Sequence, residues 1–431
     1  MTETIRLESD VALRHLEELG RPAAVSSYVV DGSTPQVAVR LDSPEAVAEA
    51  AALAAAAGLA VVPWGGGGQM GLGNRPAKYD VALDLLGLAA VVEYEPGDLT
   101  IGVQAGCTLA SVNALLTRHG QMLPVDAADP QRITIGGLVA TGLGCPRRFG
   151  YGSVRDLIIG ITVALPDGTL ARGGGMVVKN VSGYDMMRLH VGALGSLGIV
   201  VRANFKVVPA PEAQRTLLIA FRSVEEAHAA ALMVRSSQLA PTALVLLAPV
   251  TARRCSTLAG WVLAARCEGP EGAVLRQLER LRSAAASSDN DTNMLGHEET
   301  LAFWSALQEK LSAAPLFDRA RVRIGELPSR LGALGGRLLT EWGSLIEDLV
   351  LDVGSGLVYT TFAGSGDDLR AAWQRLASAG WHATLLAGPP SVKEVGDVFG
   401  RQPEGLTVMR RMKETFDPHR VLNPGRFIAR L

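Results

Sequence analysis

The densest group of residues that could do chemistry is a glycine-rich stretch that follows a short apolar run. Four consecutive glycines, Gly65–Gly68, are followed by Gly71 and Gly73. Glycine in a helix or a strand costs backbone entropy, so this run predicts a loop that turns through positive φ and approaches a ligand closely. Successive backbone N–H groups in such a loop can bind an anion. We interpret the stretch as a phosphate or diphosphate loop, because a plain turn needs only one or two glycines.

Two common phosphate-binding motifs do not fit this loop. A Walker loop requires Lys followed by Ser or Thr after its last glycine, whereas Asn74 and Arg75 follow Gly73 here. The spacing Gly66-x-Gly68-x-x-Gly71 matches the Rossmann fingerprint, but that fingerprint must open a helix. The residues after Gly73 lack a helical period and lead into an apolar run over 81–85. A loop between two strands is therefore predicted instead.

The elements that position the loop can be read from the residues before it. Ser43 and Pro44 are typical of a helix N-terminus, because serine caps the first turn and proline fits its first position. The Ala-rich run 46–57 predicts a helix, which Gly58 ends. The run Pro-Gln-Val-Ala-Val-Arg over 35–40 and the apolar run over 59–64 predict the flanking strands.

Two further stretches are rich in small residues. In the first, 134–144, small side chains recur so often that one surface is almost bare. Such a surface either packs closely on another backbone or lies against a flat ligand. Close packing remains an alternative for Gly142 and Gly144. The second stretch, 173–200, carries another group of glycines near its end.

A pair of arginines, Arg147 and Arg148, follows the first of these stretches. Paired guanidinium groups beside a binding site could hold a carboxylate in a bidentate way. They could also dock a partner subunit, or they could be solvated surface charges of little consequence. The sequence alone leaves these three interpretations open.

The composition indicates an ordinary globular protein with more than one domain. The 431 residues suffice for two or three domains and a large core. A net charge of −2 offers no basic surface for nucleic acid. The four cysteines form no C-x-x-C pair, which argues against a disulfide framework, a zinc ribbon or an iron–sulfur cluster in this chain.

The sequence predicts neither a signal peptide nor a membrane span. The first residues are acidic and lack the apolar core of a signal peptide. The longest nearly apolar run, 51–64, is shorter than the ~20 residues that cross a bilayer and contains a helix stop. We expect a cytoplasmic location, with any contact with the inner face of the membrane made through partners.

The order of these segments resembles the FAD-binding domain of the vanillyl-alcohol oxidase and p-cresol methylhydroxylase (PCMH) flavoprotein superfamily. There the glycine loop holds the FAD diphosphate, and a Thr-x-Gly-Gly segment like Thr134–Gly137 lines the flavin. The tail 417–426 resembles the superfamily's C-terminal signature, whereas Leu194 stands where Glu is usual. The resemblance implies FAD contacts from Pro63, Trp64, Gly65, Gly66, Gly67, Gly68, Gln69, Met70, Thr134, Gly136, Gly137, Ala140, Thr141, Gly142, Leu143, Gly195, Gly198, Ile199 and Val200.

A narrower resemblance is to the FAD-binding subunits of glycolate oxidase. It implies a small 2-hydroxy acid as substrate, and a second flavin subunit and an iron–sulfur subunit as partners. The groups that we assign to the substrate side are Arg147, Arg148, Lys179 and Asn423. The segments that carry the resemblance are Gly-Gln-Met-Leu-Pro (120–124), Pro-Arg-Arg (146–148), Gly-Ser-Val-Arg-Asp (152–156), Lys-Asn-Val-x-Gly-Tyr-Asp (179–185) and Asn-Pro-Gly-Arg (423–426).

The resemblance does not extend to metal-binding or FAD-attaching residues. Related 2-hydroxy-acid dehydrogenases carry a His-x-Gly-Asp-Gly-Asn-x-x-His segment, and the nearest stretch here, 361–368, has no histidine. The seven histidines show no ligand pair at helical or strand spacing, so no metal is expected. Gln69 takes the position where some relatives bond FAD through His or Cys, which predicts non-covalent FAD.

Three functions remain open. The first is the FAD subunit of a glycolate-oxidase-like complex, which oxidises a 2-hydroxy acid or relays its electrons. The second is a self-sufficient oxidase or dehydrogenase, which needs a general base that the sequence does not clearly offer. The third is a structural subunit that binds FAD weakly or not at all. The missing metal segment favours the first or the third.

The predicted fold class is α+β, with a two-subdomain PCMH-type flavin domain, an α+β cap and a C-terminal segment that returns to the flavin domain. We expect an N-terminal helical segment over 1–34 and the FAD-binding domain over 35–210. The cap or substrate domain is expected over 211–404 and the returning segment over 405–431.

Overall fold

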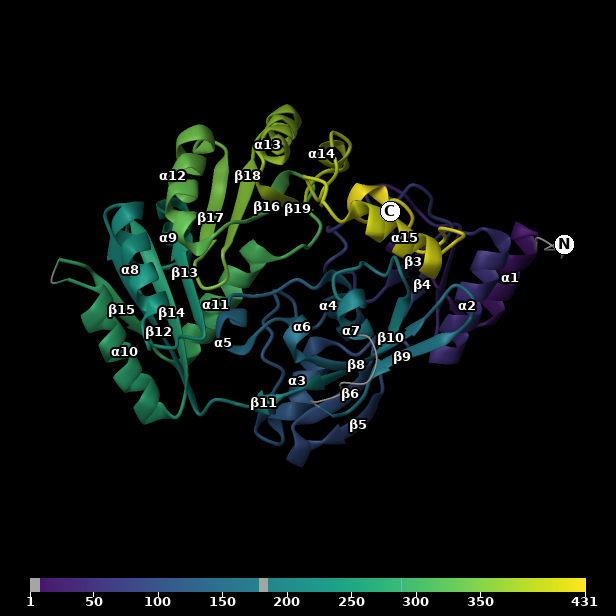
Figure 1. The fold of residues 1–431 in the computed structure, drawn as a ribbon, viewed down its shortest axis with the longest axis horizontal. Helices are drawn as coiled ribbons and strands as arrows, with labels where there is room; N and C mark the ends of the chain where they lie inside the picture. The colour runs from purple at the N-terminus through teal and green to yellow at the C-terminus, as the bar shows by residue number, and fades with distance from the viewer. Residues whose placement is uncertain (1–7, 178–184, 288) are drawn as a thin grey trace.

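The computed structural model describes residues 8–177, 185–287 and 289–431. Within these residues the strands form sheets of four, five, eight and two strands. The molecule is elongated, with the eight-stranded sheet at one end and the four- and five-stranded sheets toward the other (Figure 1). This arrangement confirms the predicted α+β class.

The four-stranded sheet, in the order β1-β2-β4-β3, carries the glycine loop. β2 and β3 both run parallel to β4, which lies between them. The predicted helix α2 connects β2 to β3, with Ser43 Oγ accepting from the Ala46 N–H at 3.1 Å and Gly58 in the left-handed conformation. The elements are α1 (Ser9–Glu18), β1 (Arg21–Pro22), β2 (Val37–Arg40), α2 (Pro44–Ala57), β3 (Val61–Trp64) and β4 (Val81–Asp84).

The five-stranded sheet is antiparallel, in the order β5-β6-β10-β8-β9, and shares a core with α3 and α4. The stretch expected only as a bare surface, 134–144, contains the short helix α4. A two-stranded ribbon joins β7 (Gln121–Met122) to β11 (Val208–Pro209). The other elements are β5 (Val91–Glu95), β6 (Thr100–Gln104), α3 (Leu109–Thr117), α4 (Ile135–Thr141), α5 (Arg148–Tyr151), α6 (Val154–Leu157), β8 (Ile158–Ala164), β9 (Leu170–Gly174), α7 (Met186–His190) and β10 (Ile199–Lys206).

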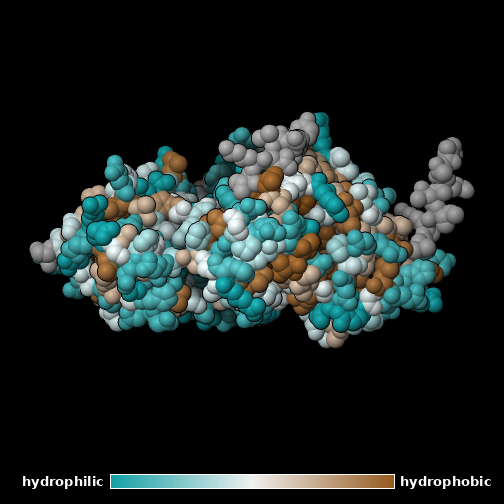
Figure 2. All heavy atoms as spheres, turned by 90° about the horizontal axis from the view of Figure 1, so that it is seen from below, coloured by the Kyte–Doolittle hydropathy of each residue, from teal (hydrophilic) through white to brown (hydrophobic). Residues whose placement is uncertain are grey.

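The outer strand β5 contributes to this sheet by backbone pairing more than by burial. It pairs with β6, and its Val91 and Val92 side chains are 42% and 47% exposed. Seen from below, hydrophobic residues gather over the middle of the molecule, with hydrophilic residues around them (Figure 2).

The eight-stranded sheet is antiparallel throughout, in the order β15-β12-β14-β13-β17-β18-β16-β19. The elements are β12 (Ala213–Phe221), α8 (Val224–Ser236), β13 (Ala243–Leu247), α9 (Pro249–Cys255), β14 (Trp261–Gly269), α10 (Glu271–Ala285), β15 (Thr292–Leu295), α11 (His297–Leu311), β16 (Arg319–Gly325), α12 (Leu331–Trp342), β17 (Ile346–Asp352), β18 (Leu357–Ala363), α13 (Gly366–Ser378) and β19 (His382–Ala387).

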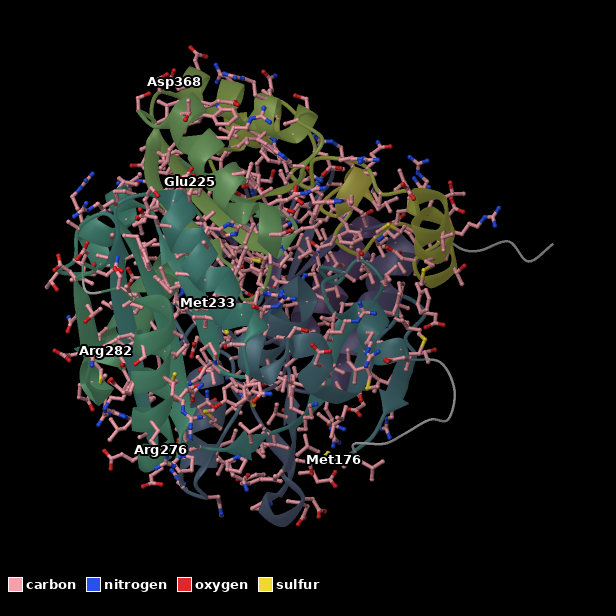
Figure 3. All side chains as sticks on the ribbon, turned by 60° about the vertical axis from the view of Figure 1, so that its left-hand side comes forward. Met176, Glu225, Met233, Arg276, Arg282 and Asp368 are labelled. Carbon is pink, nitrogen blue, oxygen red and sulfur yellow. The ribbon has the colours of Figure 1, made fainter. Side chains whose placement is uncertain are left out.

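The two faces of this sheet meet different partners. Leu244 and Leu246 of β13 belong to a core with α8, α10, α12 and α13. These helices turn charged side chains outward, as Glu225, Arg276 and Asp368 show in Figure 3. The alternate residues Val245 and Leu247 instead share a core with α9, α11 and three leucines that precede β12, namely Leu72, Leu143 and Leu194. We call the part of the molecule that precedes β12 the flavin side, after the predicted flavin domain, and the eight-stranded sheet the cap sheet. The sheet therefore packs its inner face toward the glycine loop.

The C-terminal segment returns to the first sheet, as predicted. After α14 (Pro390–Lys393) and α15 (Leu406–Phe416), the Val61 N–H donates to Val421 O at 2.7 Å. The Asn423 N–H donates back to Val61 O at 2.8 Å. The buried Lys413 ammonium strengthens this contact by pairing with Asp417 at 2.7 Å.

Candidate functional site

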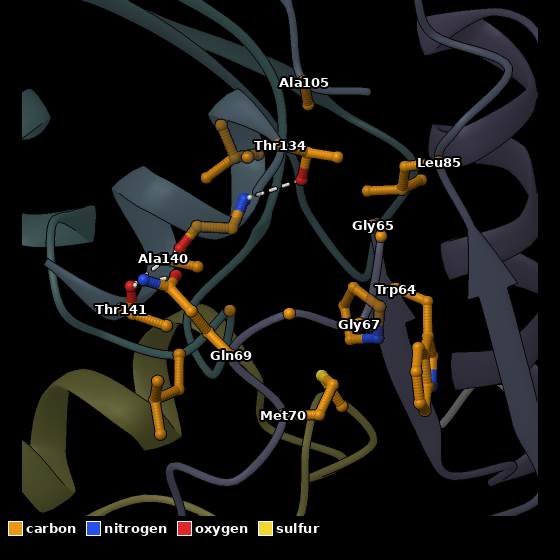
Figure 4. Close-up of a pocket in the computed structure, with 18 of the residues that line it drawn as sticks. Trp64, Gly65, Gly67, Gln69, Met70, Leu85, Ala105, Thr134, Ala140 and Thr141 are labelled. Carbon is orange, nitrogen blue, oxygen red and sulfur yellow. Dashed lines mark hydrogen bonds between the residues drawn. The ribbon is translucent and has the colours of Figure 1, made fainter. Parts of the chain in front are cut away.

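A pocket of about 770 Å³, including its mouth, lies between the four- and five-stranded sheets at the glycine loop (Figure 4). Three stretches that the sequence singled out meet in its wall. The residues of the predicted set that line it are Pro63, Trp64, Gly65, Gly66, Gly67, Gly68, Gln69, Met70, Thr134, Gly136, Gly137, Ala140, Thr141, Gly195, Ile199 and Val200.

The start of the loop requires glycine because its backbone touches the opposite wall. A Cβ on Gly65 would lie 2.2 Å from Thr134 Oγ1, and one on Gly66 would lie 2.1 Å from the carbonyl oxygen of Arg132. Gly67 adopts φ +73°, a conformation that favours glycine. The loop therefore lines the pocket with backbone N–H and C=O groups instead of side chains.

Two threonines hold the wall that faces the loop. Thr134 Oγ1 accepts a hydrogen bond from the Gly137 N–H at 3.2 Å and so caps α4. At the other end of this helix, the Thr141 hydroxyl lies 2.8 Å from Gln69 Oε1 (Figure 4). This side-chain contact joins α4 to the glycine loop, so the two walls of the pocket have a fixed spacing.

Several residues that line the pocket were missed by sequence reasoning. Leu85 directly follows β4, and Ala105 directly follows β6. Their positions at the ends of strands are the sequence signal from which they could have been predicted. Arg132 carries no motif signal of its own. The full set that was missed is Leu72, Leu85, Ala105, Arg132, Ile133, Leu194 and Arg426.

Three residues of the predicted set lie outside the pocket. Gly142 ends α4 in the left-handed conformation, and a Cβ there would lie 3.1 Å from the Gly192 backbone, so close packing explains this glycine. Leu143 is buried in the core beneath the eight-stranded sheet. A Cβ on Gly198 would point at Leu165 and His190. As cofactor contacts, these three assignments stay predictions that the lining of the pocket does not support.

Asn423 lines the pocket but is engaged with the protein itself. Its side-chain N–H donates to the backbone oxygen of Leu194, and its backbone adopts φ +49°. Its Oδ1 is buried without a hydrogen-bond partner among the described residues. The position therefore ties the C-terminal segment to the wall at 194–195 and leaves one acceptor at the pocket.

Arg147, which we assigned to the substrate side, already has two carboxylate partners within the protein. Arg147 is 8% exposed, lies outside the pocket and pairs with Glu268 and with Asp126 Oδ1, the latter at 3.0 Å. Arg266 of the cap sheet pairs with the other oxygen of Asp126 at 2.9 Å. The cluster thus joins the flavin side to the cap sheet.

Of the other two substrate-side candidates, the structure describes only Arg148. Arg148 is partly buried, and a Cβ on Gly144 would lie 3.1 Å from its Cδ, so it packs beside that glycine and does not line the pocket. Lys179 lies outside the described residues.

One buried carboxyl group lies on the face of the cap sheet that packs toward the flavin side. Asp352 of β17 is paired in register with Val245 and is fully buried. Its Oδ1 accepts from the Ser355 N–H at 3.1 Å, whereas Oδ2 has no partner among the described residues. Burial raises the pKa of Asp352 to about 7, and the hydrogen bond from the Ser355 N–H and the charge of Arg148 limit the rise.

This carboxyl group predicts a pH dependence of stability. Because the pKa of Asp352 is about 7 in the folded protein and about 3.9 in an unfolded chain, the folded state binds more protons between these values. The free energy of unfolding should therefore fall as the pH rises from about 4 to about 7. The Asp352→Asn variant should not show this fall. Above pH 7 its free energy of unfolding should exceed that of the wild type by roughly a few kcal/mol, as measured by urea unfolding across the pH range.

The exposed Asp318 provides the control for this comparison, since its side chain is 77% exposed. Asp318→Asn should leave the pH profile of the wild type unchanged. An Asp352→Asn variant with the wild-type pH profile would contradict the prediction.

The pocket suits a dinucleotide such as FAD. Its glycine loop offers backbone N–H groups, and its ionisable side chains among the described residues are the two guanidinium groups of Arg132 and Arg426. Two of the buried polar atoms without a partner, Asn423 Oδ1 and Arg426 Nε, belong to residues of its wall. A ligand that brings an anionic acceptor for Arg426 Nε and a hydrogen-bond donor for Asn423 Oδ1 would give both atoms a partner.

Comparison with known proteins decides the family. Residues 35–174 match the FAD binding domain family, and residues 400–427 match the C-terminal domain of FAD linked oxidases. The glycolate oxidase subunit GlcE of Escherichia coli is 32% identical over 359 residues, which cover 81% of this chain and 87% of that protein. The chain belongs to the FAD-linked oxidase family.

Other relatives of this FAD-linked oxidase agree with the assignment, and FAD is its cofactor. The glycolate oxidase subunit GlcD of Bacillus subtilis is 27% identical over 396 residues, or 86% of this chain and 84% of that one. The structure of 4-ethylphenol oxidase from Gulosibacter chungangensis superposes with a TM-score of 0.69 over 97% of this chain and 96% of its own. Since its identity is 15%, that likeness supports the fold alone.

Neither a metal cluster nor a membrane helix is seen in the part of the chain that the structure describes. In those residues, no three His, Cys, Asp or Glu side chains come together in a way that could hold a metal ion. None of the helices there combines the length and the apolar character needed to cross a bilayer.

Proposed function

We propose that this FAD-linked oxidase is the FAD-binding subunit of a glycolate-oxidase-like 2-hydroxy-acid dehydrogenase complex. Electrons from the substrate would pass through its FAD to a partner subunit or another acceptor. The observation that carries the proposal is the meeting of three sequence segments in one pocket, in a chain that aligns with GlcE over most of both proteins.

The residues of the pocket suggest how FAD is held. The backbone N–H groups of Gly65–Gly68 would bind the diphosphate, and the wall from Thr134 to Thr141 would lie along the flavin. Gly195, Ile199 and Val200 would pass the cofactor with backbone contacts. Bound FAD supplies an acceptor for two electrons from a CH–OH group.

The ionisable groups of the pocket favour a complex over a self-sufficient enzyme. Among its described residues these groups are Arg132 and Arg426, and a guanidinium cannot take a proton from a substrate hydroxyl. A partner subunit could supply that base, as could Lys179, which remains a candidate of the substrate side together with Arg148. A second flavin subunit and an iron–sulfur subunit are the partners that we propose, and membrane contact would be made through them.

Anaerobic reduction of the purified chain tests this function. Glycolate and D-lactate should leave the flavin of the isolated chain oxidised, and reduction should appear once the partner subunits are added. Bleaching of the flavin in the isolated chain would instead establish a self-sufficient dehydrogenase. A purified chain that holds no FAD would establish the structural subunit.

Non-covalent attachment of FAD is a separate prediction. Gln69 lines the pocket, and its amide oxygen lies beside the Thr141 hydroxyl, so this side chain offers neither an imidazole nor a thiol for a bond to flavin. Denaturation followed by ultrafiltration should carry all the visible flavin absorbance into the filtrate. A protein fraction that stays yellow would contradict this prediction.

A further inference from the structure

Two buried cations lie beside the far end of the glycine loop, and among the described residues only one of them has a carboxylate partner. Lys393 is fully buried, with Nζ 2.8 Å from Asp31 Oδ1 and 2.8 Å from the backbone oxygen of Gly71. Arg426 is 3% exposed, and its Nη2 donates to Leu72 O at 2.6 Å and to Met70 O at 3.2 Å. Arg426 forms no ion pair with a described residue. The region therefore holds one more buried positive charge than negative.

This excess charge is costly without an anion. Burial lowers the pKa of Lys393 to about 8 although Asp31 opposes the shift, and it lowers the pKa of Arg426 as well. An arginine keeps its charge at every accessible pH, so Arg426 cannot avoid the cost of a buried charge by releasing its proton. The carbonyl groups of Met70 and Leu72 compensate the charge of Arg426 only in part, and its Nε has no partner among the described residues.

The position of Arg426 shows where such an anion would bind. Its side chain lines the same pocket as Gly65–Gly68, on which the diphosphate of FAD is expected. It is packed closely there, because a Cβ on Gly73 would lie 3.0 Å from its Nη2 and 3.2 Å from its Nε. A glycine with φ +110° at position 73 makes room for the guanidinium.

We propose that Arg426 is the buried counter-charge of the FAD diphosphate. The C-terminal segment thus completes the cofactor site that the glycine loop begins, and it does so through a charge rather than through chemistry on the substrate. FAD binding and the docking of residues 417–426 are then energetically coupled. The proposal rests on the FAD-linked oxidase family and is independent of the substrate and of the complex.

Binding of FAD to the cofactor-free full chain tests the proposal. Arg426→Met should weaken FAD binding by about tenfold or more, because a charge-assisted contact is lost. Arg411→Gln is the matched control, since it removes the same charge from an exposed position of α15. Affinity is read from flavin fluorescence, with circular dichroism as the check on folding. Inorganic diphosphate should raise the melting temperature of the wild type and of Arg411→Gln, but not of Arg426→Met.

The Arg426→Lys variant provides a second test, which does not require the methionine variant to fold. A buried lysine loses its charge readily, so FAD affinity should fall more steeply than in the wild type between about pH 7 and 9. The wild type is the reference because the other titratable groups that face position 426, which are Lys393, Asp31 and Tyr79, are the same in both proteins. A methionine variant that binds FAD within twofold of the control, or a lysine variant with the wild-type pH profile, would overturn the proposal.

Discussion

The Gly66→Val variant should fold normally and lose its FAD. A Cβ at this position would lie 2.1 Å from the carbonyl oxygen and 2.8 Å from the carbonyl carbon of Arg132, so the loop must move away from the opposite wall. Backbone atoms cannot yield as a flexible side chain does. The N–H groups of the loop would then miss the diphosphate, and we expect FAD affinity to fall by about a hundredfold or more.

The ratio of flavin to protein absorbance after purification measures this loss. Gly405→Ala is the matched control, because this exposed glycine has negative φ and a Cβ there meets nothing within 4 Å. Gly67→Val should also lose FAD, since Gly67 has φ +73°. Wild-type FAD content in a folded Gly66→Val protein would refute the assignment of the loop.

The Arg147→Met variant should lower the free energy of unfolding by about 3–5 kcal/mol. Its guanidinium bridges Asp126 on the flavin side and Glu268 on the cap sheet, and the Glu268 side chain is fully buried. Removal of the cation leaves that carboxylate with Arg266 as its remaining charged partner, at 3.3 Å. The loss should appear in urea unfolding and should be smaller in a double variant that also carries Glu268→Gln.

The exposed Arg155 serves as the control, because Arg155→Met removes the same charge from the surface. That variant should change stability by less than about 0.5 kcal/mol. If Arg147→Met kept its stability and instead raised KM for a 2-hydroxy acid in the assembled complex, the arginine would belong to the substrate after all.

The two arginines that the sequence treated alike show where sequence reasoning stops. Arg147 and Arg148 are neighbours, but the first is buried between two carboxylates and the second packs beside Gly144. The partner Glu268 comes from β14, more than a hundred residues away along the chain. No local pattern contains such a pair, because the cap sheet must first fold against the flavin side. The same is true of Arg426 and the loop that it contacts.

The sequence by itself determined the features that depend on local backbone chemistry. The cap at Ser43, the stop at Gly58 and the glycine loop follow from the conformations that these residues allow, and the family resemblance followed from them. The tertiary structure alone decided which residues share the pocket. It removed Gly142, Leu143 and Gly198, and it added Arg132 and Arg426. The reason is physical: a side chain's neighbours and buried charge depend on contacts between distant segments, which no single stretch of sequence encodes.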